Sequence, residues 1–529
     1  MDRIVVSDRE RLRERFRSRN VVFRVEHRRA PPIDARERCS FLYGRIEGCS
    51  LHRHARPVNS PRTSKGPSDG VPMRKTIVIL VVGLTPSHLG PNTPRLSALA
   101  RAGAMRPLDT VTPAVTCTVQ ATFMTGSLPR DHGIVANGWL FRDLLEIWLW
   151  RQSNRLVAGE KVWEAGKRRD PGFTTANLFW WYNMGASHDV GVTPRPIYKS
   201  DGRKMPDCYT QPAALREELT RELGVFPLFQ FWGPGTSIVS SRWIADATLH
   251  VRRTRTPTLT LVYLPHLDYD LQRLGPDNPR TARSLEEIDA VAGTLIADAD
   301  REGARVIVLS EYGITAVSMP IHVNRALRQA GLLAVRTEDG GEVLDIPQSR
   351  AFALADHQIA HLYIPEPALI EEVRRIVTAL PGVDGVFDRR EQHALGIDHA
   401  RSGELVALAR PDAWFTYYYW IDDRRAPDFA RLVEIHRKPG YDPVELFLDP
   451  AISFPRLALG WRLAKRALGL RTVMDVIPLD ASLVRGSHGR IVDDPARGPL
   501  LISSEPSLVP DGPIAAAAVK SVILAHVFD

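Results

Sequence analysis

The stretch TIVILVVGLTP, residues 76–86, is the clearest structural signal in this 529-residue sequence. Seven consecutive apolar or β-branched residues, Thr76–Val82, are followed by a Gly-Leu-Thr-Pro turn. The run is far shorter than the roughly 20 apolar residues that a membrane helix needs. A short apolar run that ends in a turn is typical of a strand buried on both faces.

Two further runs of the same kind lie downstream, and each ends in a polar cluster. Leu259–Leu264 leads into Pro265–Asp270, and Arg305–Leu309 leads into Ser310–Gly313. In a mostly parallel sheet, ligands bind beyond the carboxyl ends of the strands. We therefore expect these polar clusters to contribute to a binding site.

Helix signals separate the strands. Thr93 and Pro94 predict a helix start, and Gly103 can end that helix. Ser284–Glu287 has the pattern of a capping box, and apolar residues at helical spacing follow it up to Ala299. Strands that alternate with helices in this way predict an α/β fold with a mostly parallel central sheet.

The positive charge of the chain is confined to its first 72 residues. The formal net charge is +8, and residues 1–72 hold 17 basic and nine acidic side chains. The remainder holds 52 of each, so a basic surface for a nucleic-acid partner is not indicated. Three interpretations of residues 1–72 stay open: a disordered basic tail, an extension upstream of a true start at Met73, or a small folded domain.

The stretch from about 139 to 258 differs from the rest in its many Trp, Tyr, Pro and Gly residues and its weak periodicity. We interpret it as an insertion, or cap, over the sheet edge. Its aromatic side chains, as in Phe179–Tyr182 and Phe229–Trp232, would form either the core of the cap or a stacking surface for a substrate ring.

The four cysteines, Cys39, Cys49, Cys117 and Cys208, show no metal-type CxxC spacing. A disulfide framework is not expected, and a reducing, cytoplasmic location fits. We find neither a signal peptide nor a membrane span in the sequence. The oligomeric state stays open.

The segment most informative about chemistry is VTPAVTCTVQATFMTG, residues 111–126, which continues through SLPRDHGIVAN to Asn137. A hydroxyl-rich entry leads into a short helix that Gly126 can end. Thr116 would stand at the start of this helix, where free N–H groups and the helix dipole favour an anion. A hydroxyl in that place is well sited to attack phosphorus once its proton is removed.

This segment resembles the type I phosphodiesterase/nucleotide pyrophosphatase family of the alkaline phosphatase superfamily. The resemblance rests on the nucleophile helix that ends in Thr-Gly, on Pro129–Ile134, and on Asn92–Gly103. It implies a three-layer α/β/α, alkaline-phosphatase-like catalytic domain over residues 73–529, with Thr116 as the nucleophile. It also implies divalent cations, normally two, held by Asp and His ligands.

The chain departs from the family pattern at several ligand positions. The first-strand Asp is replaced in Val82-Gly83, a His is replaced by Gln272, and an Asp-His pair has become Glu311-Tyr312. The resemblance leaves Asp268, Glu311 and His488 as ligands. These would hold one divalent cation, Zn, Mn or Mg, rather than two.

Other polar residues near these positions are candidates for supporting roles. Gln272 is a weak neutral donor, and Tyr312 would have to lose a proton to bind a metal. His266 and Asp270 flank Asp268, and Asp270 would share its side of an extended chain. Asn137 closes the motif. His357 and His361 lie in a predicted strand, where about 13 Å would separate them, too far for one metal.

The sequence therefore predicts a metal-dependent hydrolase of a phosphodiester, phosphomonoester or nucleotide pyrophosphate bond, acting on a small phosphorylated substrate. Two alternatives stay open. One is a catalytically impaired pseudoenzyme that binds a phosphorylated metabolite. The other is a biosynthetic phosphoryl-transfer or isomerase variant of the fold.

Overall fold

The computed structural model describes residues 72–201, 203–454 and 472–529, together with residues 457, 460–462, 464, 465 and 468. The extension expected at residues 1–72 thus lies outside the described residues, apart from Pro72. Within the described ranges, no helix is both long and apolar enough to cross a membrane.

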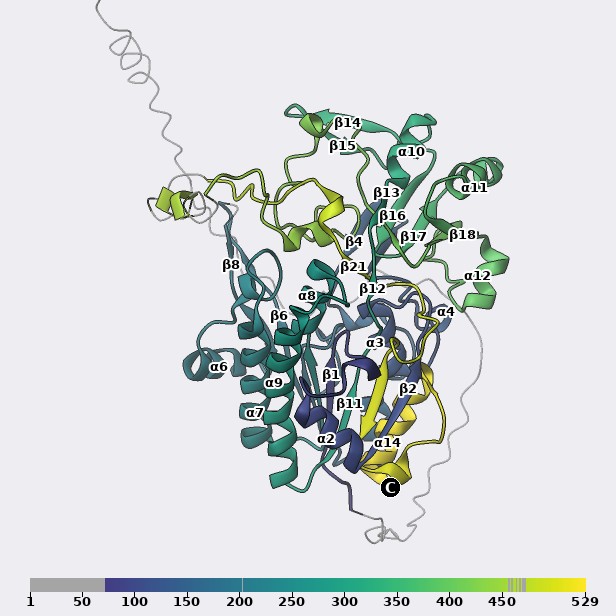
Figure 1. The fold of residues 1–529 in the computed structure, drawn as a ribbon. Coiled ribbons are helices and arrows are strands. Elements are labelled where there is room, and N and C mark those ends of the chain that lie inside the picture. The colour runs from purple at the N-terminus through teal and green to yellow at the C-terminus, as the bar shows by residue number, and fades with distance from the viewer. Residues whose placement is uncertain are drawn as a thin grey trace, which may run out of the picture. The chain divides into compact units, whose positions relative to one another are not determined.

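A nine-stranded sheet forms the centre of the main body (Figure 1). Strands β11, β1, β10, β5 and β6 run parallel, and antiparallel pairs join β22 and β9 to them. The three predicted strands are the adjacent β11, β1 and β10, which confirms them. In spatial order the strands are β23 (Ile514–Ala515), β2 (Ala104–Asp109), β22 (Leu500–Ser503), β11 (Arg305–Leu309), β1 (Thr76–Val81), β10 (Leu259–Leu264), β5 (Thr175–Leu178), β6 (Val190–Pro194) and β9 (Cys208–Gln211).

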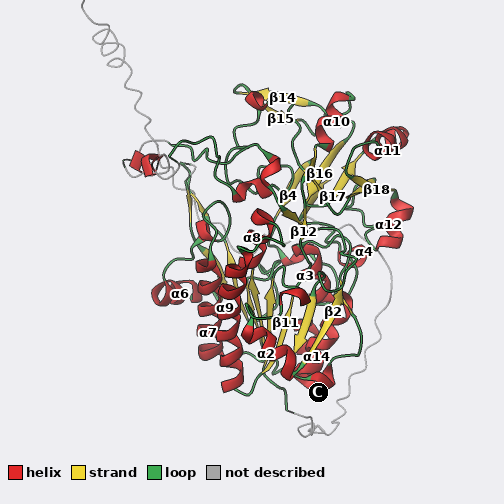
Figure 2. Ribbon diagram, in the orientation of Figure 1, coloured by secondary structure: helices red, strands yellow, loops and turns green. Residues whose placement is uncertain are grey.

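Helices cover the sheet on its two faces, as predicted for a three-layer α/β/α fold (Figure 2). One layer holds α2 (Pro94–Ala102), α7 (Ile238–Arg255) and α9 (Thr281–Arg301). The other holds α3 (Thr116–Thr125), α5 (Val162–Arg169) and α14 (Val519–Phe528). Strands β1, β10 and β11 are almost wholly buried between them, which explains their continuous apolar character.

The helix boundaries confirm one sequence signal and correct another. Helix α2 begins at Pro94 and is followed by Gly103, as expected. Helix α9, by contrast, begins at Thr281, so the predicted capping box at Ser284 is wrong. Ser284 lies inside the helix and is buried, and its hydroxyl donates a hydrogen bond to Asp270 instead of capping the helix.

The segment 139–258 contributes more to the main body than a separate insertion would. It supplies β5, β6 and β9 to the edge of the sheet and α5 and α7 to the covering layers. Its other elements are the hairpin of β3 (Gly138–Phe141) and β4 (Glu146–Leu149), the pair β7 (Ile197–Tyr198) and β8 (Lys204–Met205), and α6 (Leu215–Leu223).

A second, antiparallel sheet that the sequence did not predict has its own hydrophobic cluster. Helices α10, α11 and α12 lie near it in Figure 1. The elements are β16 (Phe352–Asp356), β17 (Ile359–Tyr363), β19 (Leu405–Ala409), β18 (Val383–Phe387), α10 (Val323–Gln329), α11 (Ile370–Thr378) and α12 (Arg389–Leu395).

Short strand pairs connect this second sheet with the carboxyl ends of the central strands. Strand β12 (Thr315–Ala316), which follows β11, pairs with β21 (Gly486–Ser487) and so brings the 486–489 loop to the sheet. The remaining pairs are β13 (Met319–Ile321) with β20 (Ala413–Phe415) and β14 (Val335–Glu338) with β15 (Gly341–Leu344).

Candidate active site

Thr116 is the first residue of α3, and Gly126, in the left-handed region at φ 69°, ends this helix. All ten residues of α3 are buried, and the helix packs against α14. The Thr116 side chain is only 4% exposed, yet it lines a large cavity. The predicted nucleophile therefore combines a rigid helical backbone with access to a ligand.

A chain of hydrogen bonds runs from Thr116 across the floor of the cavity. Thr116 Oγ1 lies 3.1 Å from Tyr312 Oη, which donates to Asp268 Oδ1 at 3.4 Å. Because the tyrosine proton points to the carboxylate, the Thr116 hydroxyl is the donor to Tyr312. Gln272 Nε2 donates to Asp268 Oδ2 at 2.6 Å, and the Tyr441 hydroxyl donates to Gln272 Oε1 at 3.0 Å.

Helix α8 (His266–Leu274) explains why Asp268 and Gln272 meet. The sequence predicted an extended backbone here, which would have placed Asp270 beside Asp268. In the helix, residues four apart share a face instead, so Gln272 takes that place. Asp270 binds Arg273 and Ser284, and His266 Nε2 lies 3.0 Å from Glu287 Oε2. The supporting roles expected for His266 and Asp270 are thereby corrected.

Four stacked rings form one wall of this floor. The His488 imidazole lies 3.6 Å, between ring centroids, from both Tyr312 and His357, and His357 lies 3.7 Å from Tyr441. His488 Nδ1 donates to the Ala114 carbonyl at 2.8 Å. Burial lowers the pKa of His488 to about 3 and that of His357 well below its usual value. Both imidazoles are therefore neutral at physiological pH.

The two predicted carboxylates have different surroundings. Burial raises the pKa of Asp268 to about 7, while the Gln272 and Tyr312 hydrogen bonds lower it. Burial also raises the pKa of Glu311 well above its usual value. Glu311 Oε1 accepts from Gln120 Nε2 at 2.6 Å, whereas Oε2 has no hydrogen-bond partner.

A divalent cation does not fit the donors of this site. In the described part of the chain, no three His, Cys, Asp or Glu side chains gather closely enough to hold a metal ion. Asp268 accepts hydrogen bonds from an amide and a phenol, and Glu311 Oε1 accepts one from Gln120. The set Asp268, Glu311 and His488, expected to hold one Zn, Mn or Mg ion, therefore does not form a metal centre here.

Asn137 acts on the start of α3 rather than on the cavity. Its Oδ1 accepts from the Cys117 N–H at 3.0 Å, while its backbone N–H and Nδ2 donate to Asp356 at 2.8 and 3.0 Å. Burial raises the pKa of Asp356 to about 6. Since Asn137 occupies the Cys117 N–H, this part of the helix start is not open to an incoming anion.

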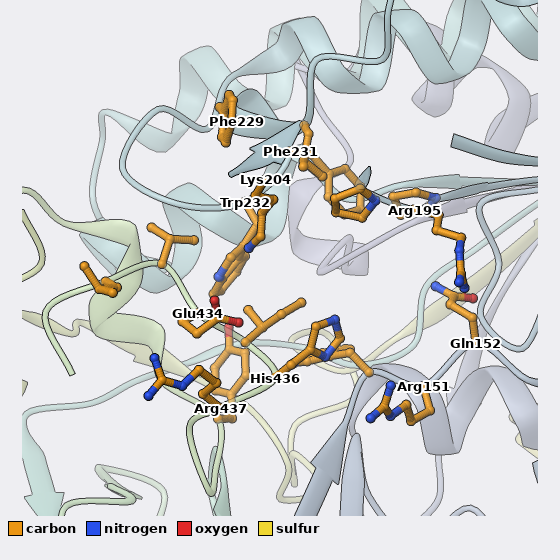
Figure 3. A pocket seen from close by; sticks show the side chains of 18 of the residues that line it. Arg151, Gln152, Arg195, Lys204, Phe229, Phe231, Trp232, Glu434, His436 and Arg437 are labelled. Atoms are coloured by element: carbon orange, nitrogen blue, oxygen red, sulfur yellow. The ribbon is translucent and has the colours of Figure 1, made fainter. Parts of the chain in front are cut away.

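The cavity above this floor measures about 2440 Å³. In Figure 3, Phe229, Phe231 and Trp232 lie above and to the left, Arg195 lies to the right, and His436 and Arg151 lie below. The aromatic side chains of segment 139–258 divide between the two expected roles. Trp180 is fully buried in the core, whereas Phe229 is 53% exposed and lines the cavity.

Several residues of the site had no recognisable sequence signal. Gln120 had no predicted role, while His357 and the stretch around Tyr441 were considered only as sources of metal ligands; each of the three contacts a predicted site residue. The expected strand over Asp356–His361 is interrupted, because His357 lies in the turn between β16 and β17 at φ 61°. That turn points its imidazole to His488, whereas His361 binds the Val135 carbonyl.

A family model and a curated relative match this sequence. The family model described as type I phosphodiesterase/nucleotide pyrophosphatase matches residues 76–442. A Schizosaccharomyces pombe protein named as an uncharacterized pyrophosphatase/phosphodiesterase is 26% identical over 242 residues, 43% of this chain. The match spans about two fifths (41%) of that curated relative.

Two solved structures share the fold. Phosphonoacetate hydrolase from Sinorhizobium meliloti, in complex with phosphonoformate, is 16% identical with a TM-score of 0.54, over 86% of this chain and 96% of its own. Murine ectonucleotide pyrophosphatase/phosphodiesterase 5, an inactive variant in complex with AMP, is 15% identical with a TM-score of 0.51, over 86% and 94%. At this identity the likeness concerns the fold alone.

Proposed function

The chain belongs to the type I phosphodiesterase/nucleotide pyrophosphatase family, and from this premise we propose that it hydrolyses a phosphoric ester or anhydride with Thr116 as nucleophile. The observation that carries the proposal is the place of Thr116, at the start of a buried helix and on the floor of the cavity. A fixed hydroxyl that faces a substrate-sized cavity is the arrangement that in-line attack requires.

The reaction has two steps. In the first, Thr116 Oγ forms a bond to phosphorus while the bond from phosphorus to the leaving oxygen breaks. In the second, a water molecule takes the place of the leaving group and cleaves the phosphothreonine, which restores Thr116. Covalent catalysis of this kind divides one difficult displacement into two easier ones.

The cavity walls support a small, anionic substrate with an apolar or aromatic part. Arg151 lies over the Trp148 ring at 3.6 Å, and Arg195 contacts Met184 Sδ. No ion pair with a carboxylate is found for either guanidinium among the described residues. Guanidinium groups without a direct ion pair, placed beside aromatic rings, favour a phosphorylated ligand with a ring or chain attached.

Turnover of bis(p-nitrophenyl) phosphate, combined with acid quenching, tests the proposal. We expect release of p-nitrophenolate, and we expect peptide mass spectrometry to find the phosphoryl group on the peptide that contains Thr116. The proposed hydrolysis would be contradicted if the protein turned over none of three substrate types: aryl phosphodiesters, aryl phosphomonoesters and AMP-containing anhydrides.

Arg151→Gln is expected to raise KM about five- to tenfold with little change in kcat. The guanidinium lines the cavity but takes no part in the hydrogen-bond chain of Thr116, so we expect it to contribute equally to binding of substrate and transition state. The measurement is steady-state kinetics with an anionic phosphodiester. Arg168→Gln is the matched control, since Arg168 pairs with Glu160 outside the cavity. A fall in kcat alone would contradict the assigned role of Arg151.

One observation favours a second function, binding without turnover. The described residues offer no metal-ligand group, and Asn137 occupies one N–H at the helix start. A binding protein would be stabilised thermally by AMP or another phosphorylated metabolite that it leaves intact. Consumption of the stabilising ligand decides in favour of the hydrolase.

A further inference from the structure

We propose that the reaction centre works without a divalent cation and that Tyr312 passes the Thr116 proton to Asp268. This inference rests on the proposed attack by Thr116 and adds the group that activates it. Tyr312 Oη lies between the two partners, 3.1 Å from Thr116 Oγ1 and 3.4 Å from Asp268 Oδ1.

Gln272 and Tyr312, which stand where the family pattern has histidines, both donate hydrogen bonds to Asp268. Gln272 Nε2 donates to one oxygen of Asp268, and the Tyr312 hydroxyl donates to the other. A buried carboxylate without donors is costly, so loss of a metal alone would leave Asp268 unsatisfied. Both substitutions instead supply it with hydrogen bonds, which indicates a rebuilt centre rather than a damaged one.

The surroundings fix this arrangement. The Tyr441 hydroxyl holds Gln272 by its amide oxygen, and the Tyr312 ring lies flat on His488, with an angle of 9° between the ring planes. His488 uses Nδ1 for the Ala114 carbonyl. The phenol of Tyr312 is thus held on both its ring and its hydroxyl, and a fixed donor and acceptor need no reorganisation during reaction.

Two neighbouring ligand positions also offer less to a cation. Val82 is buried and apolar, and Glu311 Oε1 accepts from Gln120 Nε2 at 2.6 Å, which leaves only Oε2 without a partner. Of the expected metal ligands, Asp268 and His488 line the floor of the cavity, and the Tyr312 ring packs against the His488 imidazole. A zinc site takes three or four protein ligands, which is more than this floor offers.

The proton transfer balances as follows. As Thr116 Oγ bonds to phosphorus, its proton moves to Tyr312 Oη, and the Tyr312 proton moves to Asp268 Oδ1. The leaving oxygen departs with the electron pair of its bond to phosphorus and takes a proton from solvent. In the second step a water molecule attacks phosphorus and loses a proton to solvent, and the bond between phosphorus and Thr116 Oγ breaks. Asp268 then returns its proton to Tyr312, and Tyr312 gives its own proton to Thr116 Oγ.

The first test measures the metal content of the full-length protein as purified and its turnover after dialysis against EDTA. We expect far less than one Zn, Mn or Mg ion per chain by inductively coupled plasma mass spectrometry, and unchanged turnover of bis(p-nitrophenyl) phosphate in EDTA. Stoichiometric metal, or turnover that EDTA abolishes and a metal restores, would overturn the inference while leaving the proposed hydrolysis intact. Absence of any turnover would instead count against the proposed function.

The second test removes the hydroxyl but keeps the ring. Tyr312→Phe retains the stack on His488 but removes one donor to Asp268, so we expect a cooperative melting curve at a somewhat lower temperature. We also expect a KM within about twofold of wild type and a kcat lower by about 10²- to 10⁴-fold. The control is Tyr418→Phe, since the Tyr418 hydroxyl is buried without a partner in the second hydrophobic cluster. Equal activity of Tyr312→Phe and wild type would refute the relay.

A third variant separates a structural role from a chemical one. Val82→Asp with Gln272→His and Tyr312→His restores the ligand types that the family resemblance implies. We expect this variant to bind Zn²⁺ in equilibrium dialysis where the wild type does not. Equal Zn²⁺ binding by the two proteins would show that the three positions do not decide metal affinity and would contradict the inference.

Discussion

Thr116→Ala is expected to lower kcat for bis(p-nitrophenyl) phosphate by about 10³- to 10⁴-fold or more, because it removes the atom that bonds to phosphorus. The fold should be unaffected. Tyr312 still donates to Asp268, and α3 stays buried through its other residues. Initial rates of p-nitrophenolate release give the kinetic effect, and thermal melting by circular dichroism gives the stability.

Thr116→Ser provides the matched control. Serine keeps a hydroxyl within reach of Tyr312 Oη, so we expect it to retain a substantial part of the activity, whereas Thr116→Val should behave like alanine. Equal rates for wild type and alanine would mean that phosphorus is attacked by another group, and the assignment of Thr116 would be abandoned.

Lys438→Met is expected to lower the free energy of unfolding by about 3–5 kcal/mol, because it leaves two buried carboxylates without their cation. Lys438 Nζ lies 2.7 Å from both Asp442 Oδ2 and Glu445 Oε1, and all three side chains are at most 3% exposed. Urea unfolding followed by tryptophan fluorescence measures the change. Arg437→Met, which breaks an exposed pair with Asp428, should shift stability by less than about 1 kcal/mol.

The deficit of Lys438→Met should grow with pH. Burial raises the pKa of Asp442, and loss of the ammonium raises it further. A carboxyl whose folded pKa exceeds its unfolded pKa contributes stability that is present at low pH and lost as pH rises through the folded value. The variant should therefore be closer to wild type at about pH 5 than at about pH 8. A pH-independent deficit would point to lost packing instead.

Neutralising the carboxylates as well should restore much of this stability. In Lys438→Met with Asp442→Asn and Glu445→Gln, no buried charge is left unpaired, and such replacements are often nearly neutral. The cluster also supports the cavity, since Glu445 accepts from Trp232 Nε1 at 2.5 Å and Asp442 adjoins Tyr441. Activity measurements on the triple variant would show whether the charges or only the packing position these rings.

The sequence predicted the central sheet well because local patterns determine it. The boundaries of β10 and β11 agree with the runs Leu259–Leu264 and Arg305–Leu309, and α2 lies between Thr93 and Gly103 as expected. The polar stretch after β10 was harder. Residues 265–270 directly follow a strand, and an extended backbone was expected for them. The helix His266–Leu274 forms instead because one of its faces is buried against α9, a contact that the local sequence does not reveal.

The second sheet and much of the site depend on contacts between distant residues. Tyr441 meets Gln272 across 169 positions, and His488 meets Ala114 across 374. No local pattern specifies such pairs. The family motifs correctly predicted that Thr116 and Asp268 lie in the same site. They could not predict that the Tyr312 hydroxyl lies between them, because residue types at ligand positions carry no distances.

The stack of Tyr312, His488, His357 and Tyr441 also bears on how this centre could change over generations. Each ring supports the next, so a single reversion at one position removes packing and hydrogen bonds before it restores anything. Such mutual dependence is epistasis, and it makes the return of any single position to the family's residue unfavourable. Substitutions are expected to be tolerated more readily at the cavity walls, for example at Arg151 and Phe229, which make no ring contact with the stack.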